Sequence, residues 1–282
     1  MARAMVRDLA DRNRAAAALS MIMASVSLAP MVAPFIGANI LEFAGWRAIF
    51  LLLASFGVLA CVAAWFGAPE SLRPELRGPL AILPVLGRFG ELLRTRRFMG
   101  YALTSALMFC CMFSFISGAP FVLIDGYGLS PRTFSYCFGA NVLAVTLGAI
   151  LNARLARRLG SEEILQYAVL LPAAAALALL TLGLIEHFTH AVGIWPFVPL
   201  FVLQIGGMSV IAPNATAGAL QHYPHMAGVA SSLMGVLQFG LAALFGVAVG
   251  QLVSQSLLPM VLLMAAGGIG SMAAYWLLVR VR

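Results

Sequence analysis

The sequence predicts an all-α membrane protein with about eight transmembrane helices. Of its 282 residues, 62% are hydrophobic and only 10% are charged, and the mean hydropathy is +0.98. A soluble domain is usually about half apolar and about a quarter charged, so this chain could not cover a globule with polar side chains. A membrane-spanning helix needs about 20 mainly apolar residues, and the chain has room for roughly eight once loops are allowed for.

The apolar runs give the expected order of elements. Two runs precede, and six follow, a polar segment at 68–97 that carries six arginines and the prolines Pro69, Pro74, Pro79 and Pro84. Because proline interrupts a helix, no long helix is expected in this segment. The predicted spans are 15–40, 46–67, 98–123, 131–154, 162–185, 193–219, 226–252 and 257–279.

The basic residues predict the orientation. All 17 are arginine, and all except Arg47 and Arg132 fall on one side of the predicted membrane. The positive-inside rule makes that side cytoplasmic. Both termini are then cytoplasmic, in agreement with an even number of spans, and we expect a multi-pass protein of the inner (plasma) membrane. The arginines form no stripe with interleaved aromatics, so the net charge of +7 reflects topology and no nucleic-acid partner is expected.

The residue census favours neither a metal site nor an enzyme. All four cysteines lie in apolar runs without a CxxC motif, so no disulfide framework is expected. The HxxH pairs fall on opposite sides of the predicted membrane, and neither supplies the ligands of a zinc site. A membrane enzyme would need titratable side chains clustered at one depth, and the ten acidic residues all lie near span ends or in loops. We therefore predict no cofactor and no resident proton carrier. The residues concerned are Cys61, Cys110, Cys111 and Cys137, and the pairs His187/His190 and His222/His225.

The first span contains a proline pattern. Pro30 and Pro34 are four residues apart and share one helix face, and Gly37 lies on the same face. Each proline removes a backbone hydrogen bond and bends the helix, and glycine permits close helix approach. The pattern is either a functional motif or a kinked span of ordinary kind.

A series of short motifs, in order along the chain, resembles a known family. They are Ala2–Asp8, Gly45–Phe50, Ser117–Leu123, Tyr127–Ser130, Asn152–Leu155, Ala212–Thr216, His225–Ser232 and Gln238–Phe239. Together they resemble the Bcr/CflA drug-resistance group of the major facilitator superfamily. In that superfamily the pattern of Pro30, Pro34 and Gly37 resembles the antiporter motif of the fifth helix.

The resemblance implies a fold of twelve helices in two six-helix halves. Residues 1–67 would be the remnant of the N-terminal half, 68–97 the central cytoplasmic loop, and 98–282 the complete C-terminal half. The chain would begin at the end of the fourth helix and lack the helices before it. The implied function is secondary active transport with proton-coupled efflux of drugs or small molecules, which bind near the midplane. The alternative is a non-transporting membrane partner that needs another chain.

Polar and methionine side chains mark a candidate substrate cavity. Flexible methionines with a few hydrogen-bonding groups suit varied drug-sized ligands, whereas the alternative is ordinary packing between helices. We favour packing for Ser231 and Gly235, and both interpretations stay open for the amides Gln204, Asn214 and Gln238. The candidates are Tyr101, Met108, Met112, Asn141, Gln204, Met208, Asn214 and Gln238.

Basic residues at the predicted cytoplasmic ends resemble the superfamily's inter-helix gating loop. The alternative is anchoring of the topology, which needs only positive charge. The gating candidates are Arg3, Arg7, Asp8, Asn152, Arg154, Arg157 and Arg158.

Overall fold

The computed structural model describes residues 12–67, 82–223, 226–252 and 256–280. The chain forms two compact units, residues 1–81 (unit 1) and 82–282 (unit 2). In the described ranges the regular structure is entirely helical, which confirms the predicted all-α class. Seven helices in these ranges are long and apolar enough to span a membrane.

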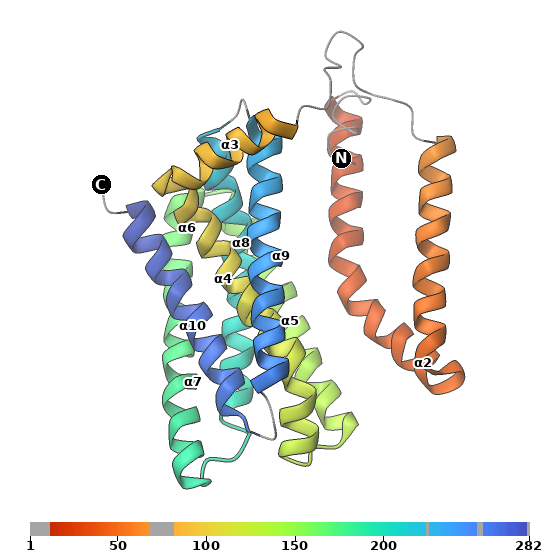
Figure 1. The fold of residues 1–282 in the computed structure, drawn as a ribbon, viewed down its shortest axis with the longest axis vertical. Coiled ribbons are helices and arrows are strands. Elements are labelled where there is room, and N and C mark those ends of the chain that lie inside the picture. Colours follow the sequence, from red (N-terminus) through yellow and green to blue (C-terminus); the bar gives the residue numbers. More distant parts are fainter. Residues whose placement is uncertain (1–11, 68–81, 224–225, 253–255, 281–282) are drawn as a thin grey trace. The chain divides into compact units, whose positions relative to one another are not determined.

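Unit 1 is a helical hairpin, α2 (Arg12–Gly67), in which the chain reverses direction (Figure 1). The reversal occurs at Gly45, with φ 74° and ψ 172°, a backbone region that only glycine adopts readily. This position separates the predicted spans 15–40 and 46–67. The candidate span Phe43–Gly67, one of the seven, contains the whole second arm. Most side chains of the first arm, including Pro30 and Pro34, lie outside the described residues, and a Cβ at Gly37 would meet no atom within 4 Å.

Unit 2 begins with a short helix and continues as a bundle of six candidate spans. The predicted boundaries of these six spans agree with the structure to within a few residues. Two spans end in π-helical turns, η2 and η4, and one is divided into α6 and α7. The elements are α3 (Ile82–Arg94), α4 (Arg96–Ala119), η2 (Pro120–Gly126), α5 (Pro131–Leu155), α6 (Ser161–Ala168), α7 (Leu170–Thr189), α8 (Phe197–Gln221), α9 (Ala227–Leu252), α10 (Leu258–Ala274) and η4 (Tyr275–Arg280).

Helix α3 lies inside the segment 68–97, where the prolines argued against a long helix. Its 13 residues start at Ile82, so Pro84 falls in the first turn, where a missing N–H leaves no intrahelical bond unmade. Phe89 and Leu92 pack against the bundle, and Leu92 is fully buried. Figure 1 shows α3 lying obliquely across one end of unit 2, where it contacts α4 and α9.

Helix α4 is the centre of unit 2 and packs against α8, α9 and α10. Two buried apolar clusters lie along it. One surrounds Phe98 and Tyr101 near its start, and the other surrounds Phe115 near its end. The Phe115 ring lies between those of Phe138 on α5 and Phe201 on α8, with centroid distances of 6.3 and 5.3 Å. In lipid such packing, rather than release of water, holds helices together.

Helices α5 and α8 run in the same direction, as the pairs of small residues along their contact show. Ala144 faces Gly206, and Gly148 faces Ser209. A Cβ at Gly148 would lie 2.2 Å from Ser209 Oγ and 3.0 Å from the Gly206 carbonyl oxygen, so only glycine permits this approach. The two backbones can therefore lie close together, as in small-residue contacts between membrane helices.

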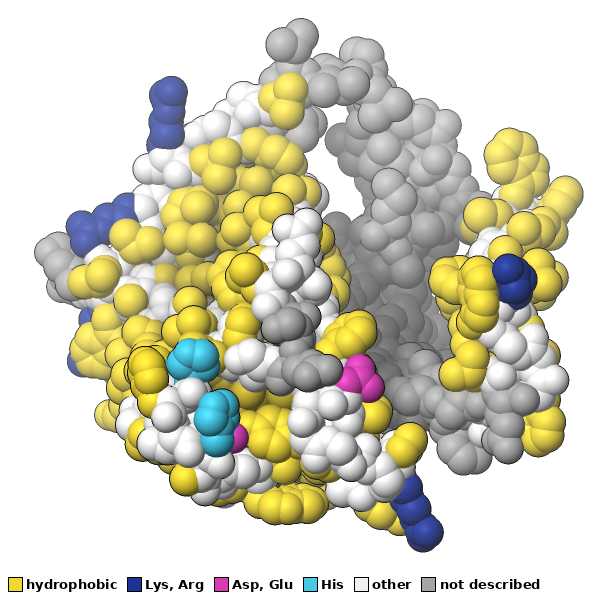
Figure 2. All heavy atoms as spheres, turned by 60° about the horizontal axis from the view of Figure 1, so that its bottom comes forward, with side chains coloured by type: hydrophobic (Ala, Val, Ile, Leu, Met, Phe, Trp, Pro, Cys, Tyr) yellow, Lys and Arg dark blue, Asp and Glu magenta, His cyan; other side chains and the backbone are white. Residues whose placement is uncertain are grey.

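Much of the outer surface is apolar. Leu143, Leu147 and Leu151 on α5 and Val236 and Leu244 on α9 are all more than half exposed. Hydrophobic side chains cover most of the described surface in Figure 2, and charged side chains are few in that view. Such a surface suits lipid or another helical unit.

Candidate functional site

The charged residues of unit 2 concentrate at one end of the bundle. We call it the arginine-rich end; α3, α4 and α6 begin or lie there, and α5, α8 and η4 end there. Of the arginines described in unit 2, Arg132 alone lies at the other end. Contacts between the starts of α4 and α6 and between the ends of α5 and α8 support this assignment. The alternation agrees with the spans predicted from the sequence.

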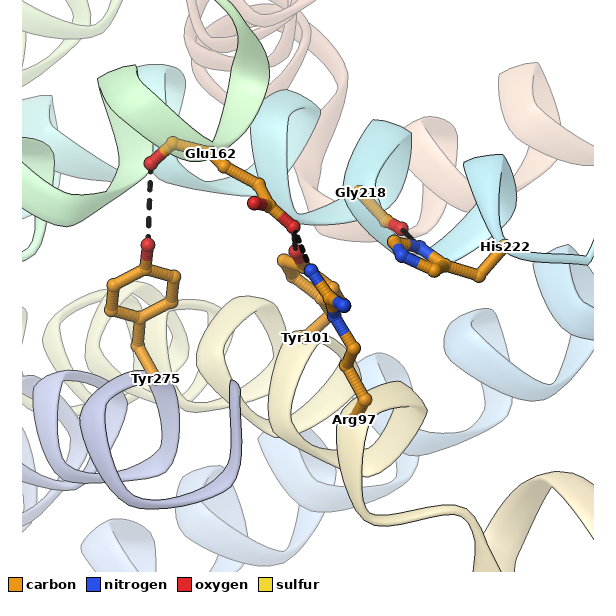
Figure 3. A network of polar contacts seen from close by, with 6 residues as sticks. All are labelled: Arg97, Tyr101, Glu162, Gly218, His222 and Tyr275. Atoms are coloured by element: carbon orange, nitrogen blue, oxygen red, sulfur yellow. Dashed lines mark hydrogen bonds and ion pairs between the residues drawn. The ribbon is translucent and has the colours of Figure 1, made fainter. Parts of the chain in front are cut away.

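Glu162 of α6 joins three elements, α4, α6 and η4, at the arginine-rich end (Figure 3). Its Oε1 accepts hydrogen bonds from Arg97 Nη2 and from the Tyr101 hydroxyl, both on α4. Its backbone carbonyl accepts from the Tyr275 hydroxyl on η4 at 3.2 Å. The ring of His222, the residue after α8, lies 6.3 Å from the Tyr101 ring, centroid to centroid, and its Nδ1 is 2.8 Å from the Gly218 carbonyl.

The Tyr101 ring is tightly packed against the backbone of α8 at Gly218. It is 1% exposed, and a Cβ at Gly218 would lie 2.6 Å from its Cε1. The ring therefore occupies space that any larger residue at 218 would fill. In this structure Tyr101, a cavity candidate from the sequence, connects α4 to α6 and packs on α8.

The pairing of Arg97 with Glu162 was not predicted, because Arg97 served only to indicate the topology and Glu162 only counted as a carboxylate outside the membrane interior. Two signals were available. Arg97 and Tyr101 are four residues apart and therefore share a helix face. Glu162 follows Gly160 in the first turn of α6, where the helix dipole favours a negative charge.

Asn214 and Asn152 connect α8 to α5. Asn214 Nδ2 donates to Asn152 Oδ1 at 2.6 Å and to the Val210 carbonyl at 2.8 Å. One cavity candidate and one gating candidate are thereby brought together. The other gating candidates in unit 2 (Arg154, Arg157 and Arg158) are exposed and form no ion pair within the described ranges, whereas Arg3, Arg7 and Asp8 lie outside them.

Gln204 lies in the middle of the bundle and is fully buried. Its Nε2 donates to the Met264 carbonyl of α10 at 2.7 Å and to Cys111 Sγ of α4 at 3.3 Å. Its Oε1 has no partner in the described structure, and neither has Oδ1 of the buried Asn141 on α5. Two buried amide oxygens are thus left for a water molecule or a ligand to satisfy.

Gln238 is half-buried between α9 and α4. Its Nε2 donates to Ser105 Oγ at 2.6 Å. One turn further along α4, Phe109 packs edge-on against Phe239 with centroids 5.7 Å apart, and Phe239 is 60% exposed. An amide and two aromatic rings therefore lie on one accessible face, which we call the α4–α9 face.

The methionine candidates divide by exposure. Met108 is fully packed, whereas Met112 and Met208 are half-buried. Ser231 is exposed and a Cβ at Gly235 would meet no atom within 4 Å, so neither residue makes the close helix contact within unit 2 that we favoured for them. The cavity candidates that hydrogen-bond to another helix in the described ranges are Tyr101, Gln204, Asn214 and Gln238.

At the opposite end of unit 2, the carboxylate of Glu186 accepts several hydrogen bonds. Glu186 Oε1 accepts from the Tyr127 hydroxyl at 3.0 Å, and Oε2 accepts from the backbone N–H groups of Val192 at 2.7 Å and Gly193 at 3.3 Å. Burial of the phenol, and then the neighbouring Glu186, raise the pKa of Tyr127. A pocket of about 410 Å³ here is lined partly by Glu186, His187 and His190. No group of three or more His, Cys, Asp or Glu side chains that could hold a metal occurs in the described part of the chain, and His225 lies outside it.

The fold and these sites define a multi-pass helical membrane protein. The family model for the Major Facilitator Superfamily matches residues 1–247. The chain therefore belongs to the Major Facilitator Superfamily, a family of transporters rather than enzymes. The resemblance found in the sequence motifs is confirmed.

The relatives include drug-resistance proteins. The chain is 31% identical over 275 residues to the "Bicyclomycin resistance protein homolog" of Haemophilus influenzae, covering 98% of this chain and 68% of the relative. It is 34% identical over 252 residues to the "Uncharacterized MFS-type transporter YdgK" of Bacillus subtilis, covering 89% and 61%. It is 26% identical over 271 residues to the "Multidrug resistance protein MdtL" of Vibrio parahaemolyticus, covering 96% and 66%. The chain thus spans about two thirds of the length of these relatives.

Proposed function

We propose that the chain takes part in efflux of drugs or other small molecules across the inner membrane, coupled to proton entry. The observation that carries this proposal is the similarity to resistance proteins over nearly the whole chain, within a family of transporters. The arginine-rich end would face the cytoplasm with both termini, following the positive-inside rule. The division into 1–67, 68–97 and 98–282 belongs to the same proposal, as does the antiporter-like role of Pro30, Pro34 and Gly37.

The α4–α9 face is the part of unit 2 that we propose contacts substrate. It offers a hydrogen-bonding amide, Gln238, next to Phe109 and Phe239, and Met112 lies three residues beyond Phe109 on the same helix. Drug-sized sites combine mostly apolar lining with a few polar groups. Gln204, Asn141 and Asn214 would then support the bundle from inside, because they are buried and bonded between or along helices.

Proton coupling is supported by the family resemblance alone. Every carboxylate whose side chain is described lies at an end of a helix or in a loop of unit 2. A coupled pump loses its activity when the proton gradient is collapsed. Drug accumulation measured with and without a protonophore therefore tests the coupling apart from the transport.

The test of transport is drug susceptibility in cells that lack their own efflux pumps. Expression of the chain should lower susceptibility, and Gln238→Ala should restore it in part. Gln251→Ala is the matched control, since Gln251 is an exposed glutamine on the same helix α9. No resistance from the chain at normal membrane levels would overturn transport by the chain alone and favour the alternative of a partner chain, which copurification would reveal.

A further inference from the structure

Two arginines are held on one corner of the arginine-rich end by neutral groups. Arg96 Nη2 donates to the Leu277 carbonyl of η4. The Arg280 guanidinium stacks on Trp276, with Cζ 4.2 Å from the ring centroid. Neither arginine has a carboxylate within 4.0 Å in the described ranges. We call Arg96, Arg280 and Trp276 the arginine corner.

Topology alone does not require this arrangement. A positive-inside residue acts by its charge and needs no fixed position. Here both guanidiniums are anchored to the same turn of η4, within four residues of one another along that element. A guanidinium has five N–H donors in a planar fork, so the one bond from Arg96 and the stacking of Arg280 leave donors that match a phosphate.

The nearby carboxylates do not cancel the charge. A pocket of about 390 Å³ beside the corner is lined by Arg97, Glu162, Glu163 and Arg280, with Gln166, Tyr275 and Val279. Arg97 already pairs with Glu162, so Glu163 is the pocket carboxylate left to oppose Arg280. On α3, Glu91 and Arg94 are both exposed and carry opposite formal charges. Arg96 therefore remains as surplus positive charge beside Arg280.

Exposed apolar side chains occur on η4 and on α3, the helix that precedes Arg96. Leu277, whose carbonyl holds Arg96, is 60% exposed, and Leu93, at the end of α3, is 45% exposed. Leu277 lies near the end of the candidate span Leu258–Arg280, and Leu93 lies three residues before the start of the candidate span Arg96–Gly126. Charged donors next to exposed leucines at this level would meet a lipid phosphate and its acyl chain together.

We propose that the arginine corner binds the phosphate of an anionic phospholipid in the leaflet at the arginine-rich end. Arg96 and Arg280 contact the phosphate, and Leu277 and Leu93 contact the acyl chains. The leucines distinguish a lipid from a free phosphate ester, which would gain nothing from them. The proposal is independent of transport, because binding requires no substrate.

The test is binding by the purified full chain in neutral detergent, measured as the rise in melting temperature during titration. The probes are a short-chain phosphatidylglycerol, a phosphatidylcholine with the same acyl chains, and glycerol 3-phosphate. We compare the wild type with Arg96→Gln, Arg280→Gln and the double variant. Arg132→Gln, an exposed arginine at the opposite end, is the control, and the Arg96→Lys/Arg280→Lys variant retains charge without the fork.

The wild type should bind phosphatidylglycerol more tightly than phosphatidylcholine and should not respond to glycerol 3-phosphate. Affinity should fall about fivefold for each arginine removed, since a basic residue near the surface contributes about 1 kcal/mol. The lysine variant should retain part of the preference, and Arg132→Gln should retain all of it. An equal response of the wild type to both lipids, or a full response to glycerol 3-phosphate, would overturn the proposal even if the double variant failed to fold.

Discussion

Asn214 donates its side-chain amide to Asn152 Oδ1 at 2.6 Å, and this bond joins α8 to α5 near the arginine-rich end. The same contact surface carries the close approach of Gly148 to Ser209 further along the two helices. Asn152 lies one turn before the loop that holds Arg157 and Arg158. The bond therefore helps to fix the end of α5, which precedes the gating candidates Arg157 and Arg158.

The Asn152–Asn214 bond should appear as a coupling between the two residues. A double-mutant cycle with Asn152→Ala and Asn214→Ala should give a coupling free energy of about 0.6 kcal/mol and at most about 1.7 kcal/mol, the range for such bonds in membrane proteins. The measurement is reversible unfolding of the purified chain in mixed micelles. Asn141 provides the control, because its Nδ2 bonds to Cys137 O within its own helix. Coupling as large between Asn141 and Asn152 would show that the cycle reports general loosening of α5.

Gly267 should resist enlargement more than a helix glycine with open space around it. A Cβ there would lie 2.8 Å from the Leu107 carbonyl oxygen and 2.5 Å from Cys111 Sγ, so α10 would have to move away from α4. We expect Gly267→Ala to cost about 1–3 kcal/mol of stability, as overpacking does. Gly250→Ala on α9 is the matched control, since its Cβ would meet nothing within 4 Å and alanine favours helix by up to about 1 kcal/mol. A melting-temperature ranking in which both variants behave alike contradicts the close contact.

The helix order could be predicted from the sequence because lipid imposes a strong and local rule. Each span must satisfy its own backbone hydrogen bonds, so an apolar run of sufficient length becomes a helix wherever it lies. The reversal at Gly45 followed from the same pattern. Helix α3 was not predicted, because it lies in the polar segment 68–97, outside the apolar runs. Its stability comes from Phe89 and Leu92 packing on the bundle, which is a tertiary effect.

Side-chain partners were harder to predict for a related reason. Helical spacing identifies which residues share a face, but not which neighbouring helix that face meets. Tyr101 and Gln238 were both identified as polar groups on apolar faces, yet their partners, Glu162 and Ser105, are 61 and 133 residues away in sequence. The amides Gln204, Asn214 and Gln238 each bond to another helix. Only the structure shows which of these amides are buried between helices and which are accessible.

The two tyrosines around Glu162 should differ in their contribution to stability. Tyr101 donates to the charged carboxylate, whereas Tyr275 donates to the neutral backbone carbonyl at 3.2 Å. Hydrogen bonds to charged acceptors are the stronger kind, so Tyr101→Phe should cost about 1 kcal/mol and Tyr275→Phe less. Both variants keep the ring, which separates the bond from the packing. Unfolding in mixed micelles measures the difference.

Glu162→Gln provides the check on that comparison. It removes the charge that Tyr101 and Arg97 share, so Tyr101→Phe should cost less in the Glu162→Gln background than in the wild type. The Tyr275→Phe cost should be unchanged, because Tyr275 contacts the backbone. Equal costs for Tyr101→Phe in the two backgrounds would show that the hydroxyl bond contributes nothing through the carboxylate.

Tyr127 should make the opposite end sensitive to alkaline pH. Burial, and then the Glu186 carboxylate, raise its pKa above the ordinary value of 10.0. A group whose folded pKa is raised gives stability that is fully present below the unfolded pKa and is lost as pH rises through the folded pKa. We therefore expect the chain to lose stability above about pH 10, where the unfolded phenol ionises first.

Variants should show whether Tyr127 causes the loss of stability at alkaline pH. Tyr127→Phe should make the fall in melting temperature above about pH 10 shallower, because the phenol that must ionise is gone. Glu186→Gln should shift the phenolate absorbance of Tyr127 toward lower pH, by only part of the full displacement, since burial is the larger cause. Tyr136→Phe, which removes an exposed tyrosine at the same end, controls for loss of a phenol in general. An alkaline fall in Tyr127→Phe as steep as in the wild type would place the sensitive group elsewhere.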